Sequence, residues 1–479
     1  MTINTSKCRS EQELLRKVIA MNPKAFDEIT AGERGDLMWF GLALDESEVE
    51  LVAGKIINRF PGMKEAAHKR ELGAALNLLA KYYPEDFDFF PKTYTFPEDY
   101  ERLQQDMEAR RCAQYIVKPS AGSQGEGIYM ISKFRELNSF GARSLEDLVV
   151  QEYLGSPLLI NQKKFDLRFY AVVTGVNPLC AYVCDEGLAR FCTEDYDSRS
   201  STNCFAHLTN YSLNKRSAKF IHTDELSAPN EGSKQTLTSL WNRLQAQGLD
   251  VDTVQEDIRH VIAKTLVAAQ SVLLTQHSVA LKAANEHGVR CFQLIGVDIL
   301  LDRHLKPWLL EINANPSLRI DFEEEVSPGI TQSLPSPLDE HVKTIAVADA
   351  FRLLRLSPEE LAGVERLRSY RRVLPDIFPA TGELFCGIRR AFEALVPLRT
   401  PDAVTSAKFR TLGKWLPLMS ADFDIIFKTI CRKRSVNQLG LMAFIAALET
   451  IAKKLTPTLD AKTAMEQLLT TVQVHLESA

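Results

Sequence analysis

The segment LIGVDILLDRHLKPWLLEINANPSL, from Leu294 to Leu318, carries the clearest structural pattern of the chain. Two apolar runs, Leu294–Leu301 and Trp308–Ile312, have the composition of β-strands. The polar stretch Asp302–Lys306 lies between them and is typical of a turn. The segment is therefore predicted to form an antiparallel β-hairpin.

The register of this hairpin can be predicted because the residue numbers of paired positions add to a constant. Pairing Asp298 with Glu311 centres the turn between His304 and Leu305, among the polar residues. The two carboxylates then face each other, and Asn313, two residues further on, shares their face. The predicted apolar face consists of Val297, Ile299, Leu310 and Ile312.

Two facing carboxylates repel each other unless a cation or a proton lies between them. A set of two carboxylates and one amide oxygen suits Mg²⁺, whereas zinc usually takes histidine or cysteine. Asp298, Glu311 and Asn313 are therefore predicted as magnesium ligands. The alternative is structural: one carboxylate is protonated, or is paired with Arg319 or Lys306.

A glycine-rich loop lies in YIVKPSAGSQGEGIYMI, residues 115–131, between two strand-like runs. Gly122, Gly125 and Gly127 allow close approach of the backbone to a ligand, and Lys118 ends the first run. The loop lacks the Lys-Ser/Thr ending of a P-loop and is followed by a strand. This pattern is compatible with phosphate binding, and a plain β-hairpin is an equally simple interpretation.

The segment KKFDLRFYAVV, from residue 163, alternates polar and apolar side chains with the period of a β-strand. Lys164, Asp166, Arg168 and Tyr170 share one face, which is predicted either to line a ligand site or to face water. Further polar residues on strands and loops nearby are Arg190, His207, Thr209 and Asn210.

The chain of 479 residues is long enough for two to four domains. Its net charge of −5 gives no general attraction to nucleic acid, and no apolar run is long enough to span a membrane. The nine scattered cysteines predict free thiols in a reducing compartment, hence a cytosolic protein.

Helices are predicted over residues 65–81 and 251–285 and over most of the chain beyond residue 340. The proline-containing stretch 89–100 is predicted as a connector, and the acidic stretch 323–338 as a domain boundary, with a second break at residues 374–379. The basic stretch Arg366–Arg372 is predicted as a solvated helix face, and the alternative is a local basic patch that meets an acidic partner such as a tubulin tail.

Taken together, the motifs resemble the tubulin–tyrosine-ligase-like family, a branch of the ATP-grasp enzymes. The resemblance covers roughly residues 35–320 and includes FPGMKEAAHKRELG, YIVKPSAGSQGEGI, VVQEYLGSPLLI, KKFDLRFYAVV, HLTNYSLNK and KPWLLEINANPSL. It implies an α/β (α+β) ATP-grasp fold that binds ATP and Mg²⁺.

The resemblance also implies roles for individual residues. The residues expected to bind ATP are Lys69, Lys118, Gly125, Gly127, Gln151, Glu152, Tyr153, Leu154, Lys164 and Asp166. Those expected to act in catalysis are Arg168, Arg190, His207, Thr209 and Asn210. The magnesium ligands are expected to be Asp298, Glu311 and Asn313.

Residues 383–455 are similar to the p25-alpha domain of tubulin polymerisation-promoting proteins, an EF-hand-like all-α module associated with microtubules. The expected organisation is an N-terminal α/β subdomain (1–110), the central and C-terminal ATP-grasp subdomains (111–322), a linker with a basic helical segment (323–380) and a p25-alpha-like domain (381–479). The EF-hand calcium pattern is missing, so calcium binding is not expected.

The two resemblances imply a ligase that adds glutamate to the acidic C-terminal tails of tubulin. The expected partners are tubulin or microtubules and free glutamate, without nucleic acid or membrane. The expected location is the microtubule cytoskeleton of the cytoplasm, including the axoneme or basal body of a cilium or flagellum. Glycine or tyrosine as the donor, a non-tubulin acceptor, and a non-catalytic microtubule-binding scaffold are the alternatives.

Overall fold

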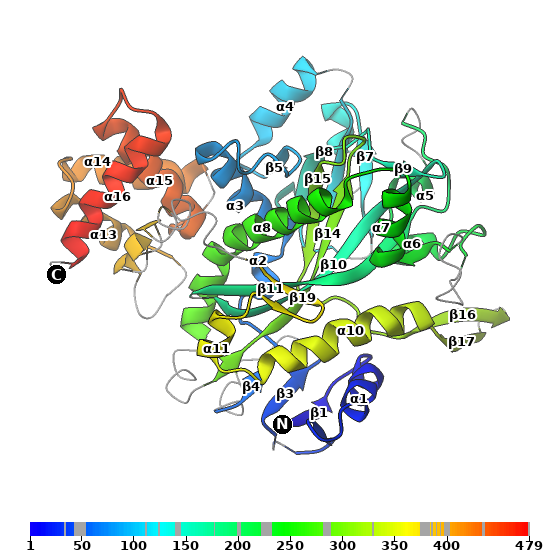
Figure 1. Cartoon of the computed structure of the whole chain (residues 1–479). Helices are drawn as coiled ribbons and strands as arrows, with labels where there is room; N and C mark the ends of the chain where they lie inside the picture. Colours follow the sequence, from blue (N-terminus) through cyan, green and yellow to red (C-terminus); the bar gives the residue numbers. More distant parts are fainter. Residues whose placement is uncertain are drawn as a thin grey trace.

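The computed structural model describes the chain except for residues 33–34, 43–53, 111–112, 123–124, 139–144, 177, 199–202, 222–231, 281–288, 328–329, 374–383, 385–386, 389, 393, 397–402, 434–435 and 478–479. The predicted break at residues 374–379 and the end of the helix predicted to reach residue 285 lie outside the described residues. The fold is mixed α/β with several sheets, as predicted (Figure 1).

The N-terminal part forms a five-stranded parallel sheet in the order β13-β4-β3-β1-β2. Its strands are β1 (Thr2–Lys7), β2 (Asp27–Ile29), β3 (Leu37–Phe40), β4 (Ile56–Ile57) and β13 (Arg290–Cys291). The helices of this part of the chain are α1 (Gln12–Ala20), α2 (Met63–Ala66) and α3 (Lys69–Tyr82). The predicted helix 65–81 is thus divided in two, with His68 in extended conformation at the start of α3.

A four-stranded antiparallel sheet follows, in the order β5-β8-β6-β7. It consists of β5 (Thr93–Thr95), β6 (Tyr115–Pro119), β7 (Tyr129–Ile131) and β8 (Leu148–Glu152), and α4 (Tyr100–Ala109) follows β5 in the chain. The prediction that residues 89–100 are only a connector was wrong, since three residues between the prolines pair with β8.

The largest sheet has eight strands, six of them in the order β15-β14-β10-β11-β19-β18. These are β10 (Lys163–Val176), β11 (Leu179–Phe191), β14 (Gln293–Leu301), β15 (Pro307–Asn313), β18 (Arg366–Leu367) and β19 (Tyr370–Val373). Two short strands join it: β9 (Leu159–Ile160) pairs with β10, and β12 (Lys234–Thr236) pairs with β11.

Helices pack on the faces of this sheet and also lie in the connections between its strands. Near its edges lie α5 (Cys204–His207), α6 (Tyr211–Asn214) and α7 (Leu237–Ala246). The long helix α8 (Val251–Ala280), predicted from the sequence, packs with its apolar side chains into the same core as the sheet (Figure 1). Among the described residues, no helix has the length and apolar character required to cross a bilayer. The cysteines that the structure describes are free thiols: Cys8, Cys180, Cys184, Cys192, Cys204, Cys291 and Cys431.

The described residues of the stretch 323–338 belong to a β-hairpin and to the start of a helix, and the domain boundary expected there stays a prediction. β16 (Asp321–Ser327) and β17 (Ile330–Pro335) form a hairpin that projects from the body of the molecule (Figure 1). Helix α10 (Pro337–Leu354) then packs against α1 and the large sheet in one apolar core, with α11 (Pro358–Ala362) after it.

The basic stretch Arg366–Arg372 was predicted as a helix face, and this was wrong. It forms the strands β18 and β19, and β19 pairs with β11 through Tyr182–Arg372 and Val183–Arg371. Arg366 and Arg371 both contact Asp185 of β11, at 3.0 and 3.2 Å. Pairing with a distant strand thus decides the local structure here.

The described residues from 404 to 477 form helices joined by short turns, with an isolated bridge between Val404 and Leu439. They form α13 (Ser406–Phe409), α14 (Ser420–Lys433), α15 (Leu441–Leu455) and α16 (Ala461–Glu477). This C-terminal helical unit touches the end of α3. Glu449 accepts a hydrogen bond from Tyr82 Oη at 2.8 Å and forms an ion pair with Lys81 at 2.8 Å.

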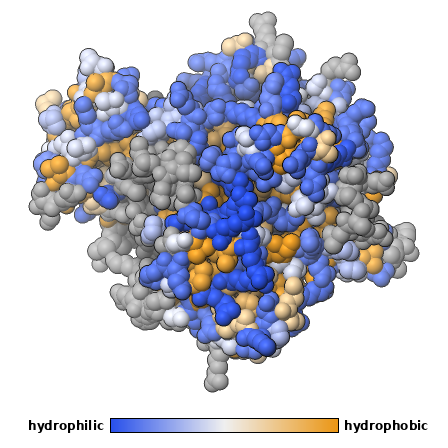
Figure 2. All heavy atoms as spheres, viewed as in Figure 1, coloured by the Kyte–Doolittle hydropathy of each residue, from blue (hydrophilic) through white to orange (hydrophobic). Residues whose placement is uncertain are grey.

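On the face of the molecule seen in Figure 2, hydrophilic side chains predominate and apolar side chains form scattered patches.

Candidate active site

The hairpin of β14 and β15 has the predicted register at its functional end. Asp298 is paired with Glu311, and Gly296 is paired with Asn313. The register then shifts by one residue, so that Ile299 pairs with Leu309. This bulge corrects the predicted apolar face: Leu309 is fully buried in the core, whereas Leu310 lines the candidate site.

Asp298 is buried, with 2% of its surface exposed, and is held by two arginines. Arg168 lies opposite it on the neighbouring strand β10 and donates two hydrogen bonds, through Nε to Oδ1 and through Nη2 to Oδ2 at 2.8 Å. Arg190 Nη2 reaches Oδ2 at 2.8 Å. Burial alone would raise the pKa of the Asp298 carboxyl, but the two guanidinium groups outweigh it and hold this pKa well below its ordinary range.

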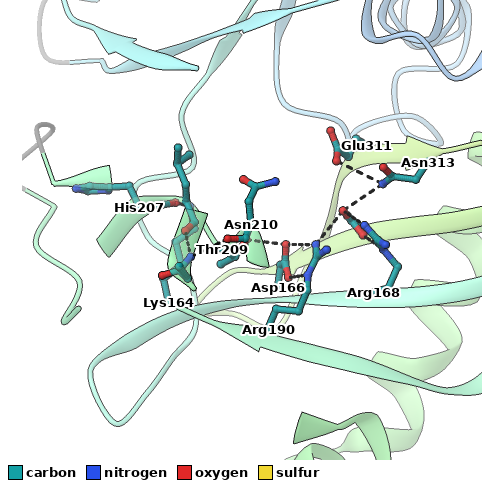
Figure 3. A network of polar contacts seen from close by, with 12 residues as sticks. Lys164, Asp166, Arg168, Arg190, His207, Thr209, Asn210, Glu311 and Asn313 are labelled. Carbon is teal, nitrogen blue, oxygen red and sulfur yellow. Dashed lines mark hydrogen bonds and ion pairs between the residues drawn. The ribbon is translucent and has the colours of Figure 1, made fainter. Parts of the chain in front are cut away.

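A second buried carboxylate, Asp166, extends this network along β10. Arg190 donates to both of its oxygens, at 2.7 and 2.6 Å, and Thr209 Oγ1 donates at 2.6 Å (Figure 3). Arg190 bridges the two carboxylates, Asp166 of β10 and Asp298 of the neighbouring strand β14, and Arg168 is held by Asp298, so the network fixes both arginines in place. Each has unused N–H donors for a further anion.

Two lysines lie near Glu311. Lys69, the first residue of α3, contacts Glu311 Oε2 at 3.0 Å and donates to the carbonyl of Gly122 at 2.9 Å. Lys118 donates to Gln151 Oε1 at 2.7 Å, and Gln151 in turn donates to Thr93 Oγ1 at 2.9 Å. The side chain of Gln151 thus holds Lys118 in place. The contact with ATP that the sequence predicts for Gln151 does not require this side chain, because the backbone can make it.

Burial lowers the pKa of Lys118 from 10.5 to about 8, although Glu311 counteracts part of this effect. A phosphate group would favour the charged lysine, so phosphate binding takes up a proton above that pKa. For ATP, the ligand that the sequence predicts here, we therefore expect KM to rise above pH 8, by up to roughly tenfold per pH unit. KM measured from pH 7 to 9.5 tests this, with Lys118→Met expected to raise KM and to flatten its pH dependence. An equally steep profile in the variant would contradict the assignment.

His207 lies apart from the predicted magnesium ligands. Its ring points away from Glu311 and Asn313 (Figure 3), and its Nδ1 lies 2.8 Å from Tyr153 Oη. Lys164 donates to the same hydroxyl at 3.1 Å and to the carbonyl of His207 at 2.9 Å. The sequence grouped His207 with Thr209 and Asn210, and the structure places its ring instead at the Tyr153 end of the site.

A cavity of about 650 Å³, its open mouth included, connects these groups. The predicted residues that line it are Lys118, Gln151, Glu152, Tyr153, Leu154, Lys164, Asp166, His207, Thr209, Asn210, Asp298 and Glu311. Gly125 and Gly127 have φ of +83° and +68°, a left-handed conformation that favours glycine. A Cβ on Gly125 would come within 3.2 Å of Asn210 Oδ1, so the glycine loop packs directly against the cavity.

Arg168 and Arg190 line an adjoining polar cavity of about 920 Å³ that sequence reasoning missed. Behind them, Lys234 and Lys343 both contact Asp339, at 2.6 and 2.9 Å. Lys234 lies on β12 directly opposite Arg190, and Lys343 and Asp339 lie on α10. No motif marks these residues. The i, i+4 spacing of Asp339 and Lys343 was the one signal available.

The donors around Asp298 and Glu311 fit a magnesium ion. The amide of Asn313 lies between the two carboxylates, 3.4 Å from Asp298 Oδ2 and 3.3 Å from Glu311 Oε1. Rotation of that amide would present an oxygen in place of the nitrogen. Since the arginines already use three of the roughly four acceptor positions of Asp298, this carboxylate can offer a metal a single oxygen.

The sequence was compared with known proteins. Residues 47–331 match the model of the tubulin-tyrosine ligase family. "Tubulin polyglutamylase TTLL11" of Mus musculus is 37% identical over 365 residues, which are 74% of this chain and 49% of that protein. "Tubulin polyglutamylase TTLL6" of Mus musculus is 35% identical over 363 residues, 74% of this chain and 40% of the relative.

"Tubulin polyglutamylase ttll-11" of Caenorhabditis elegans is 33% identical over 394 residues, 78% of this chain and 55% of the relative. The chain thus spans about half the length of the curated relatives that it matches. The family match covers more than half of this chain and contains both carboxylate strands, the glycine loop and the paired arginines. The chain belongs to the tubulin-tyrosine ligase family.

Proposed function

We propose that this protein is an ATP-dependent ligase that adds glutamate to glutamate side chains, or to chains already present, on tubulin C-terminal tails. The observation that carries the proposal is the network of Asp166, Arg190, Asp298 and Arg168. This network lies between the cavity lined by Lys118 and Lys164 and the second cavity, which is lined by more cations. The relatives named tubulin polyglutamylases support the choice of substrate.

ATP would occupy the first cavity. Lys69 and Lys118 stand beside Glu311 and the glycine loop, where they would offset the charge of the phosphates. Asp298, Glu311 and Asn313 would hold Mg²⁺, which supplies charge neutralisation at the transferred phosphate. Tyr153 and Leu154, at the far end of the cavity, would meet the base.

The reaction fits the order of these groups. A carboxylate of the acceptor tail attacks the γ-phosphate of ATP, which forms an acyl phosphate and releases ADP. The amino group of free glutamate then attacks the acyl carbon, an amide bond forms, the nitrogen loses a proton to solvent, and inorganic phosphate leaves with the electrons of the broken C–O bond. Arg168 and Arg190, fixed by the two aspartates, hold the carboxylates in place between the cavities, so that catalysis is chiefly positioning.

Glutamate as the donor is supported by the charge of the second cavity. Its cationic lining residues are Arg168, Arg190, Lys215, Lys234, Arg319 and Lys343. Asp321, Asp339 and Glu323 offset part of that charge. Glutamate has two carboxylates to pair with these cations, whereas glycine and tyrosine have one.

We expect incorporation of glutamate into microtubules to exceed that of glycine or tyrosine by at least about tenfold, the effect of one additional charge-assisted hydrogen bond. Radiolabelled amino acids, tested separately with ATP and Mg²⁺, measure this directly. Equal incorporation of glycine would refute the donor assignment. No incorporation of any amino acid, in protein that binds ATP, would favour a non-catalytic scaffold.

The C-terminal helical unit would attach the ligase to its substrate as a p25-alpha-like module. Residues 404–479 contain ten lysines and arginines against six aspartates and glutamates, although the whole chain has a net charge of −5. A basic unit beside an acidic body suits an acidic polymer. The location proposed on this basis is the microtubule cytoskeleton, including the axoneme or basal body.

A further inference from the structure

A third cavity, of about 450 Å³, lies at the end of β11. Its lining includes Thr193, just beyond the end of β11, and Gln235 of β12. Gln235 pairs with Ala189, whereas its neighbour Lys234 pairs with Arg190 and lines the cationic cavity. Because neighbouring side chains on a strand point to opposite faces, β12 separates the two cavities.

Three cations line this end-strand cavity: Lys163, Lys219 and Arg243. None of the lining residues that the structure describes is acidic. Arg243 is held by a neutral partner, Asn161 Oδ1, at 2.7 Å. Lys219 and Lys163 pair with carboxylates outside the lining, with Glu194 at 2.6 Å and with Asp195 at 3.4 Å, so Arg243 is the lining cation for which the structure describes no acidic partner.

Gln235 supplies an independent indication of a ligand. Its side chain lines the cavity and is only 4% exposed, yet its Oε1 has no hydrogen-bond partner within the described part of the chain. A buried carbonyl oxygen without a donor costs roughly 1–3 kcal/mol, so such atoms usually meet a donor from a ligand or water. The cavity thus offers an acceptor beside three cations.

A ligand that satisfies both features carries an N–H donor and a carboxylate. Ile160, Phe191 and Ile221 add an apolar wall that suits the methylene groups between them. A glutamate residue within a peptide has all three parts: a backbone N–H, two methylenes and a carboxylate. Aspartate has one methylene fewer.

We propose that the end-strand cavity binds a glutamate residue of the acidic acceptor, remote from the residue being modified. This inference rests on the proposed function. Thr193 follows Arg190 by three residues, a distance of roughly 10 Å along an extended chain. An acceptor must therefore extend several residues beyond the modified glutamate to reach the cavity, so that the site selects long acidic tails.

The test uses the full chain and fluorescein-labelled hexaglutamate, with binding followed by fluorescence anisotropy. Gln235→Leu and Arg243→Gln are each expected to weaken binding at least fivefold. In ligation assays both should raise KM for a long acidic tail, and leave KM for a triglutamate acceptor, KM for ATP and kcat unchanged. Arg16→Gln, which removes an exposed arginine paired with Glu28 on the opposite part of the fold, is the matched control.

Unchanged hexaglutamate binding in Gln235→Leu would overturn the proposal. So would a loss in Arg243→Gln alone that disappears at high salt, because that pattern indicates general charge attraction. Melting curves confirm that each variant is folded. The binding assay needs no catalysis. A wild type that binds hexaglutamate through Gln235 but ligates nothing would refute the proposed function and retain the site.

Discussion

Glu311→Gln is expected to reduce ligation by at least about 100-fold and to leave the fold intact, since it removes one charge from the phosphate and metal site. Glu311 is partly exposed, with 22% of its side chain accessible, and its ion pair with Lys69 is accessible to water. Loss of such a pair changes stability by less than about 1 kcal/mol. The large effect should therefore appear in the rate alone.

Incorporation of labelled glutamate and the melting temperature, measured on the same preparation, separate these outcomes. Glu28→Gln is a close control, because Glu28 has similar exposure (23%) and a single ion pair, with Arg16 at 3.0 Å. It should change neither quantity appreciably. Near-normal ligation by Glu311→Gln would remove the basis for the metal assignment.

Asp298→Ala is expected to abolish ligation and also to destabilise the fold, by about 3–5 kcal/mol. Arg190 is buried and Arg168 nearly so, with 12% of its side chain exposed, and Asp298 is the only carboxylate among the described residues that pairs with both. Without it, Arg168 remains as a buried charge without its ion-pair partner. The cost arises from that stranded charge more than from the lost attraction.

Chemical denaturation of wild type, Asp298→Ala and the double variant Asp298→Leu/Arg168→Met measures this effect. Replacing the charged pair by apolar side chains should restore part of the stability without restoring activity. A single variant as stable as wild type would show that the arginines find other partners. The depressed pKa of Asp298 implies that its contribution is complete above its unfolded pKa, near pH 4, and is lost as the pH falls towards the folded value.

The sequence was sufficient for the parts of the site that depend on local periodicity. The two-residue period of strands placed Lys164, Asp166 and Arg168 on one face. The spacing across a tight turn placed Asp298 opposite Glu311. Both are properties of a few neighbouring residues, and tertiary packing did not change them.

The remainder depends on contacts between distant segments. A bulge shifted Leu310 into the site, and no residue in the strand signals it. Arg168 and Asp298 are 130 residues apart. The periodicity of each strand therefore predicts on which face its side chain lies, but it does not predict that the two side chains form an ion pair. Arg371 and Arg372 have favourable helix propensity, and pairing with β11 overrode it.

That pairing of β19 with β11 has a consequence for synthesis of the protein. The main sheet gains its strand at residues 370–373 only after the ribosome has made roughly 180 residues beyond β11. At about 5–20 residues per second, this delay lasts on the order of 10–40 s. During that time the edge of β11 at Ala181–Cys184 lacks its partner strand, so a nascent chain exposes an unpaired strand edge for a defined period.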